Sequence, residues 1–187
     1  KNPRYKSAAQ IIHQLCDVVS KNGNLLLNVG PKADGSFADE AVSILKEVGK
    51  WLAVNGEAIY QTRPFSVYGE GLAEIKDTDF DVSQIEDQIR KGVFSEGAEE
   101  SLSAADIRFT TRGDNVYAII MGCPQNEKVH LTSLCNTDSG AVAEIKRIDI
   151  LGGAKNLEWT RDSSALTIKL KGEMPSPYAN VLKIVYN

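Results

Sequence analysis

The segment formed by residues 24–30 sets the strongest limit on how this chain can fold. It is short and apolar without alternation, which is typical of a parallel strand buried on both faces. Such a strand needs neighbours on each side, because unpaired backbone groups in a core are costly. The first sixty residues offer no second strand of this kind. The pattern therefore predicts the last repeat of a larger α/β sheet or barrel whose other strands lie outside this chain.

Helical periodicity predicts a helix on each side of that strand. Ser7 and Gln10 form a capping box at the start of the first helix, and Asn22 with Gly23 suits its end. The second helix is expected from about Ala38, with acidic residues in its first turn. The two apolar stripes consist of Ala8, Ile11, Ile12, Leu15, Cys16 and Val19, and of Ala41, Ile44, Leu45, Val48, Trp51 and Leu52.

From residue 106 the apolar period changes to two, which predicts short antiparallel strands. A turn at 112–115 joins the first two strands, and later strands are expected at 129–131, 145–150, 157–159, 166–170 and 181–186. Strands of this length between turn residues are typical of a β-sandwich. The predicted fold class is α/β plus all-β. Residues 1–60 form the last helix-strand-helix portion of a (β/α)8-like barrel, 61–71 a connector, and 72–187 an antiparallel β-sandwich with an acidic excursion at about 77–100.

Composition excludes several classes of function. The net charge of −4 disfavours nucleic acid as a partner, and no apolar run approaches the roughly 20 residues that span a bilayer. Cys16, Cys123 and Cys135 have no metal-ligand spacing, and only His13 and His130 could supplement them, so no metal site is expected. A Cys123–Cys135 bridge and the cellular compartment both stay open.

The residues by themselves offer little catalytic chemistry. His13 and His130 fall in different predicted domains, and each fits a structural or surface role. Carboxylates are plentiful, but turns, first helical turns and the acidic excursion explain most of them. Trp159 and Tyr117 could form a sugar-stacking platform, although a core role is the more common one for such residues.

Several motifs in order carry a family resemblance. The stretch from Leu15 to Pro31, followed by Asp34-Gly35, resembles the last barrel strand and its approach in the α-L-fucosidases of glycoside hydrolase family 29. The resemblance continues through residues 49–52, 55–60 and 62–64. Residues 106–110 and 116–119 resemble the opening hairpin of that family's C-terminal β-sandwich.

The resemblance implies a retaining hydrolase that removes terminal α-L-fucose, using an Asp nucleophile and a second carboxylate as acid and base. It implies no metal or organic cofactor and suggests a secreted, periplasmic or lysosomal/vacuolar setting. Both carboxylates belong to segments that would precede this chain, so no catalytic residue is expected here and the chain alone should be inactive. The expected partners are the remainder of the barrel, on the same or a separate polypeptide, and a fucosylated glycan. The missing initiator methionine also suggests an internal piece of a longer protein.

Asn28 is the one candidate substrate-binding residue. It is polar, lies within an apolar strand and falls near the C-terminal rim where barrel sites form. A buried amide that ties the loop at Pro31 to a neighbouring strand is the more common role for such an asparagine. The alternative function for the chain is a non-enzymatic glycan-binding or structural β-sandwich module. Residues 7–54 favour the enzyme, because a free module has no use for one buried parallel strand between two helices.

Overall fold

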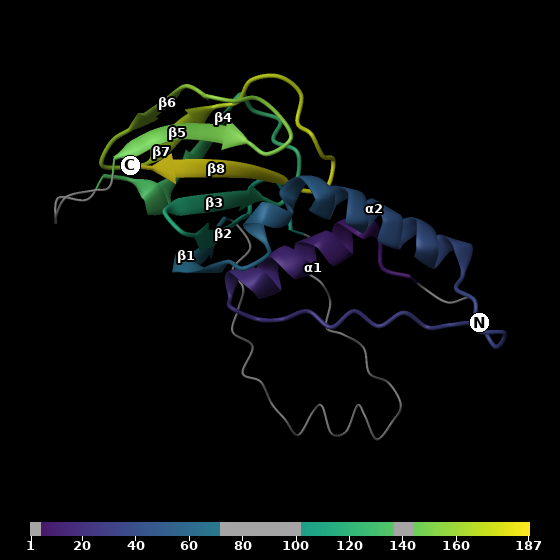
Figure 1. The fold of residues 1–187 in the computed structure, drawn as a ribbon. Coiled ribbons are helices and arrows are strands. Elements are labelled where there is room, and N and C mark those ends of the chain that lie inside the picture. Colours follow the sequence, from purple (N-terminus) through teal and green to yellow (C-terminus); the bar gives the residue numbers. More distant parts are fainter. Residues whose placement is uncertain (1–4, 72–101, 137–143) are drawn as a thin grey trace.

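The chain forms three layers in the computed structural model, which describes residues 5–71, 102–136 and 144–187. Helices α1 (Ala8–Ser20) and α2 (Asp39–Asn55) cover one face of a five-stranded sheet, and a three-stranded sheet lies on its other side (Figure 1). The predicted acidic excursion at 77–100 lies outside the described residues. The two-layer sandwich expected from the sequence is thus extended by a helical layer.

Local capping signals account for the ends of α1. The Gln10 N–H donates to Ser7 Oγ at 3.2 Å, and the Ser7 N–H donates to Gln10 Oε1 at 2.8 Å, so the predicted capping box is present. Asn22 adopts a φ of +65° directly after the helix, in the left-handed region that ends helices. Helix α2 continues instead into a short 3-10 turn, η1 (Gly56–Ala58).

All strand pairs among the described residues are antiparallel, which confirms the predicted antiparallel β architecture. Strand β2 (Ile107–Arg112) is joined to β3 (Asn115–Ile120) by a two-residue turn in which Gly113 has a φ of +57°, a value that favours glycine. A second 3-10 turn, η2 (Thr132–Leu134), follows β4 (Lys128–Leu131). The five-stranded sheet has the order β1 (Arg63–Glu70), β2 (Ile107–Arg112), β3 (Asn115–Ile120), β8 (Asn180–Tyr186), β5 (Ile145–Ile150). The smaller sheet has the order β4 (Lys128–Leu131), β7 (Leu166–Lys169), β6 (Trp159–Arg161).

Strand β1 occupies most of the expected connector at 61–71. It pairs with β2 at the edge of the sheet, with a register shift between Pro64 and Gly69. An edge position suits Pro64, which has no N–H to donate. At Gly69 the two backbones come so close that a Cβ would lie 2.5 Å from the carbonyl oxygen of Ile107. A segment with turn-like composition therefore forms a strand because β2 offers it a free edge.

The five-stranded sheet is buried on both faces. Phe109 and Leu182 face the small sheet and pack with its Leu131, Leu166 and Ile168. On the other face, side chains of β3 and β8 pack against the helices in a second cluster. This cluster comprises Ala8, Ile11, Ile12, Cys16, Val48, Trp51, Ala58, Ile59, Tyr117, Ile119, Met121, Leu151, Ala179 and Val181.

The expected strand at 24–30 is not formed in this chain. The segment is extended coil that runs back along the helices (Figure 1). Leu26 is 85% exposed and Leu27 is 37% exposed. Every described strand pairs within the two antiparallel sheets, so no parallel neighbour is present to accept this segment. The described residues accordingly show no closed barrel.

Candidate functional site

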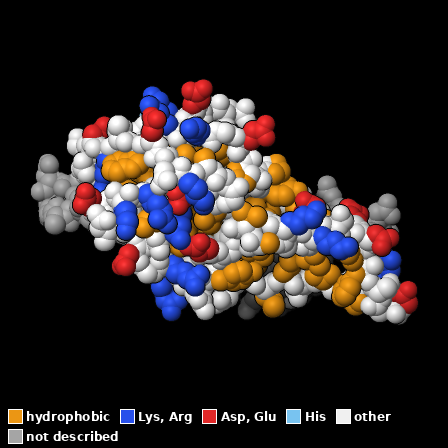
Figure 2. Space-filling model, turned by 45° about the horizontal axis from the view of Figure 1, so that its top comes forward, with side chains coloured by type: hydrophobic (Ala, Val, Ile, Leu, Met, Phe, Trp, Pro, Cys, Tyr) orange, Lys and Arg blue, Asp and Glu red, His pale blue; other side chains and the backbone are white. Residues whose placement is uncertain are grey.

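An apolar groove between the two helices and the 24–30 segment is the candidate site. Its volume is about 270 Å³, and Ile11 of α1, Ile44 and Leu45 of α2, and residues 25–30 contribute to its walls. Hydrophobic side chains also gather on the surface towards the helical end of the molecule (Figure 2). No Asp or Glu is among the described residues that line the groove. It therefore holds neither of the paired carboxylates that glycoside hydrolysis uses.

Asn28 lines this groove and is exposed. Its side-chain amide has no hydrogen-bond partner among the residues that the structure describes, and in particular makes no bond to the loop that follows Pro31. The amide is therefore free to meet a ligand or a neighbouring chain segment. Gln14 of α1 and Lys6 are other polar residues of the groove, and they hydrogen-bond to each other at 3.1 Å.

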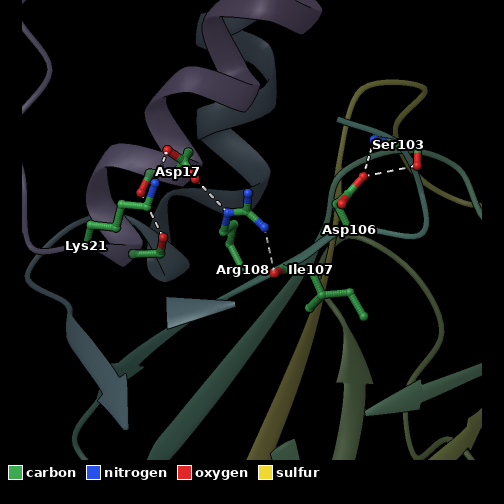
Figure 3. A network of polar contacts seen from close by, with 7 residues as sticks. Asp17, Lys21, Ser103, Asp106, Ile107 and Arg108 are labelled. Atoms are coloured by element: carbon green, nitrogen blue, oxygen red, sulfur yellow. Dashed lines mark hydrogen bonds and ion pairs between the residues drawn. The ribbon is translucent and has the colours of Figure 1, made fainter. Parts of the chain in front are cut away.

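A partly buried ion pair joins α1 to the large sheet just before the groove segment (Figure 3). Arg108 Nε donates to Asp17 Oδ1 at 2.7 Å, and the Arg108 side chain is 3% exposed. Lys21 Nζ contacts the other oxygen of Asp17 at 2.9 Å. Arg108 Nη1 donates to the carbonyl of Ile107 at 3.1 Å, whereas Nη2 is buried without a partner. The pair fixes the last turn of α1, from which the chain enters the 24–30 segment.

A second polar cluster ties η1 to the same face of the sheet. The Tyr117 hydroxyl donates to Glu57 Oε1 at 2.7 Å, and Lys183 forms an ion pair with the same oxygen. Burial, together with the hydrogen bond to Glu57, raises the pKa of Tyr117 above its ordinary range. Burial acts to raise the pKa of Glu57, but the hydrogen bonds from Lys183 and Tyr117 outweigh it and hold that pKa below its ordinary value. Glu57 is thus a structural carboxylate on the β-domain side of the helices.

Two further side chains attach the helices to the loop before β8. Trp51 Nε1 donates to the carbonyl of Ala179 at 2.9 Å in a buried position. His13 Nε2 lies 2.9 Å from the carbonyl oxygen of Tyr178, and a carbonyl can only accept, so this nitrogen carries the proton. His13 therefore has a structural contact. His130 is exposed and pairs across the small sheet with Thr167.

The sequence offered only part of this arrangement. Alternation in β2 assigns Arg108 and Thr110 to the face opposite Phe109, and both lie there, but nothing local shows that helices cover that face. Tyr117 is fully buried, which is the core role expected for it. Cys123 and Cys135 do not pair, and Cys16 is buried, which raises the pKa of its thiol.

Comparisons with known proteins agree with this architecture. Residues 1–57 match the family model described as α-L-fucosidase, and residues 100–185 match the α-L-fucosidase C-terminal domain. The chain is 31% identical over 169 residues to the human tissue α-L-fucosidase, covering 90% of this chain and 28% of that protein. An α-L-fucosidase of Branchiostoma floridae is 25% identical over 185 residues, which covers 96% of this chain and 33% of the relative.

Solved structures of α-fucosidases resemble this chain over nearly its whole length. The crystal structure of the Thermotoga maritima α-fucosidase superposes with a TM-score of 0.68 at 27% identity, over 99% of this chain and 36% of that one. The chain thus spans about a third of the length of the relatives that it matches. No helix within the described residues is long and apolar enough to cross a membrane. The chain belongs to the α-L-fucosidase family, glycoside hydrolase family 29, and includes its C-terminal β domain.

Proposed function

We propose that this chain is part of a retaining α-L-fucosidase that hydrolyses terminal α-L-fucose from glycans, with both catalytic carboxylates outside the chain. The match of residues 1–57 to the α-L-fucosidase model carries the proposal. A relative at 27% identity, the Thermotoga maritima enzyme, has been solved in complex with fucose. A purely non-enzymatic module is not favoured, because residues 1–57 match the enzyme model and not only its C-terminal domain.

In this proposal residues 1–60 complete a (β/α)8-like barrel supplied by the rest of the enzyme. Residues 24–30 are already extended and make no backbone hydrogen bond among the described residues, so they can add to a parallel sheet without losing backbone pairing within this chain. Pairing would bury Leu26 and satisfy the backbone groups of the segment. The helices would then cover this strand as well as the β domain.

Asn28 would line the fucose pocket in the assembled barrel. It lies near the C-terminal end of the added strand, which is where catalytic and binding residues of such barrels are placed. Its amide is not used by the described residues, so it can hydrogen-bond to a sugar hydroxyl. The catalytic steps belong to the two external carboxylates, one as nucleophile and one as acid and then base. The chain's own contribution is to bind and orient the sugar.

Hydrolysis of an aryl α-L-fucoside tests the assignment of roles. We expect the complete enzyme to turn over, and the 187-residue chain alone to show no turnover, because removing the acid or base of such an enzyme costs orders of magnitude in rate. Turnover by the chain alone that is abolished by changing an acid within it would overturn the proposal.

Asn28→Ala in the complete enzyme tests the binding role. If Asn28 contacts fucose, kcat/KM falls while the melting temperature stays near that of the parent. If the amide is structural instead, the change leaves a buried partner unsatisfied and costs about 1–3 kcal/mol of stability with little kinetic effect. Measuring both quantities on one preparation separates these outcomes.

A further inference from the structure

A charged pocket of about 360 Å³ lies at β5 and β8, away from the groove. Its walls carry Arg147, Lys155 and Lys183; Asp149 is the one carboxylate among the described residues that line it, and Asn156 lies beside it. Lys and Arg side chains gather over the β domain in the view of Figure 2. The pocket therefore carries a local excess of positive charge on a chain whose net charge is −4.

Asp149 organises this pocket rather than opposing an anion. It is 5% exposed, and its two oxygens are already used. Arg147 Nε donates to Oδ2 at 3.1 Å, and the Asn156 N–H donates to Oδ1 at 2.9 Å. Asn156 has a φ of +52°, a left-handed conformation that asparagine tolerates better than most residues. The carboxylate therefore orients both the guanidinium and the turn that carries Asn156.

Several donors remain for a ligand. The two terminal nitrogens of Arg147 and the side-chain amide of Asn156 make no hydrogen bond among the described residues. Lys155 Nζ reaches only the carbonyl of Ile150, at 3.5 Å. Lys183 is shared with Glu57, so it adds positive charge near the pocket but less donor capacity. These donors come from one strand and one turn whose relative position Asp149 fixes.

We propose that this pocket binds a singly charged oxyanion, a sulfate ester or a carboxylate, carried by a saccharide. Guanidinium, ammonium and amide donors converging on a concave site suit the oxygens of such a group. Arg147 is already paired with Asp149, and Lys183 with Glu57, so the remaining positive charge suits one negative charge better than several. That the carrier is a saccharide rests on the proposed fucosidase function. The β domain would then hold an acidic glycan while the barrel acts on its fucose.

Binding of monosaccharides that lack fucose tests the inference apart from catalysis. Saturation-transfer NMR would be recorded on the complete enzyme, with fucose present to occupy the catalytic pocket. The probes are galactose sulfate, glucuronic acid and neutral galactose. We expect the two acidic sugars to bind in the millimolar range and galactose about tenfold more weakly or not at all. Binding of only one acidic sugar would identify the group that the pocket takes. Equal binding of all three, or of none, would overturn the inference.

Matched variants locate the site. Lys155→Ala removes a donor, and Asn156→Gly removes the amide while keeping a residue that tolerates positive φ. Each should weaken acidic-sugar binding about tenfold without changing turnover of an aryl α-L-fucoside. Lys146→Ala removes the same charge from β5 at an exposed position outside the pocket, and should leave binding unchanged. Unchanged binding in Lys155→Ala and Asn156→Gly would place the site elsewhere. If the unmodified complete enzyme does not hydrolyse the aryl α-L-fucoside, that result counts against the proposed function and not against the pocket.

Discussion

The β domain and the 24–37 segment are both rich in apolar residues, yet they end in opposite states. Leu131, Leu166 and Ile168 of the small sheet are fully buried against the large sheet. In the 24–37 segment Leu26 is 85% exposed and Phe37 is 47% exposed. The difference is the presence of a partner: the sandwich contains both of its sheets, whereas the segment has no strand beside it. An apolar pattern specifies that a surface will be buried, but not that the burying surface belongs to the same chain.

The apolar residues of the two helices are intermediate in burial. Each buries one side on the large sheet, through Ile12 of α1 and Trp51 of α2 for example. Ile44 and Leu45 on α2 remain half-buried at the groove. The β domain thus holds the helices in place, while their other side stays partly open at the groove.

The largest loss of stability should come from truncating a side chain in the core of the β-sandwich. Leu166→Ala leaves a cavity in the sandwich core and should cost about 2–5 kcal/mol of unfolding free energy in the 187-residue chain. Leu26→Ala is its matched control, with the same atoms removed from an exposed site, and should stay within about 0.5 kcal/mol. Chemical denaturation of both variants and the parent chain measures the two changes in unfolding free energy.

Leu26→Ala in the complete enzyme tests whether the segment is buried there. There Leu26 would be buried by neighbouring strands, so Leu26→Ala should cost at least about 2 kcal/mol. A large loss already in the 187-residue chain would show that the segment packs within the chain. No loss in the complete enzyme would show that the barrel does not take it up.

A smaller loss of stability is expected where α1 meets the β domain. Asp17→Asn keeps the shape of the side chain but leaves Arg108 charged and buried without its counter-ion, since arginine does not deprotonate in proteins. We expect a loss of about 2–3 kcal/mol, less than for a fully buried pair, because Asp17 and Lys21 still reach water. Lys50→Ala breaks an exposed pair with Glu47 and should change the unfolding free energy far less, because exposed ion pairs contribute little. Equal losses for the two variants would mean that the Asp17–Arg108 pair does not anchor α1.

Elements specified by local chemistry could be predicted from the sequence. The capping box at Ser7 and the turn at Gly113 need only neighbouring residues, and both are present. The predicted strand at 24–30 is not formed within this chain, because it depends on partners that the chain does not supply, and its place in a barrel stays a prediction. The strand within the expected connector was missed for the complementary reason, since Pro64 and Gly69 indicate a turn until β2 provides an edge.

The site was less predictable than the fold. Arg108 could be placed on a face by alternation, but its ion pair joins residues 91 positions apart in the sequence. No local pattern indicates which side chain will cover which strand at that separation. Asn28 could be singled out because a polar residue within an apolar segment indicates a specific hydrogen-bonding role, whether or not the segment forms a strand in this chain. Its role in fucose binding stays a prediction.

The smallest effect concerns the pH dependence of the contact between η1 and the β domain. The pKa of Glu57 is held below its ordinary value, so Glu57 contributes stability that is present above its unfolded pKa and is lost as the pH falls through the lower, folded pKa. The difference in unfolding free energy between the parent and Glu57→Gln should therefore be largest near neutral pH and should shrink as the pH falls below about 4.5. Glu158→Gln is the matched control, because the pKa of Glu158 is also lowered, by Lys169, but on an exposed surface away from the helices. Added salt should abolish the Glu158 effect and preserve most of that at Glu57, since exposed pairs are screened more strongly than partly buried ones. A salt response that is the same for both variants would show that the Glu57 cluster is a surface contact and does not anchor η1 to the β domain.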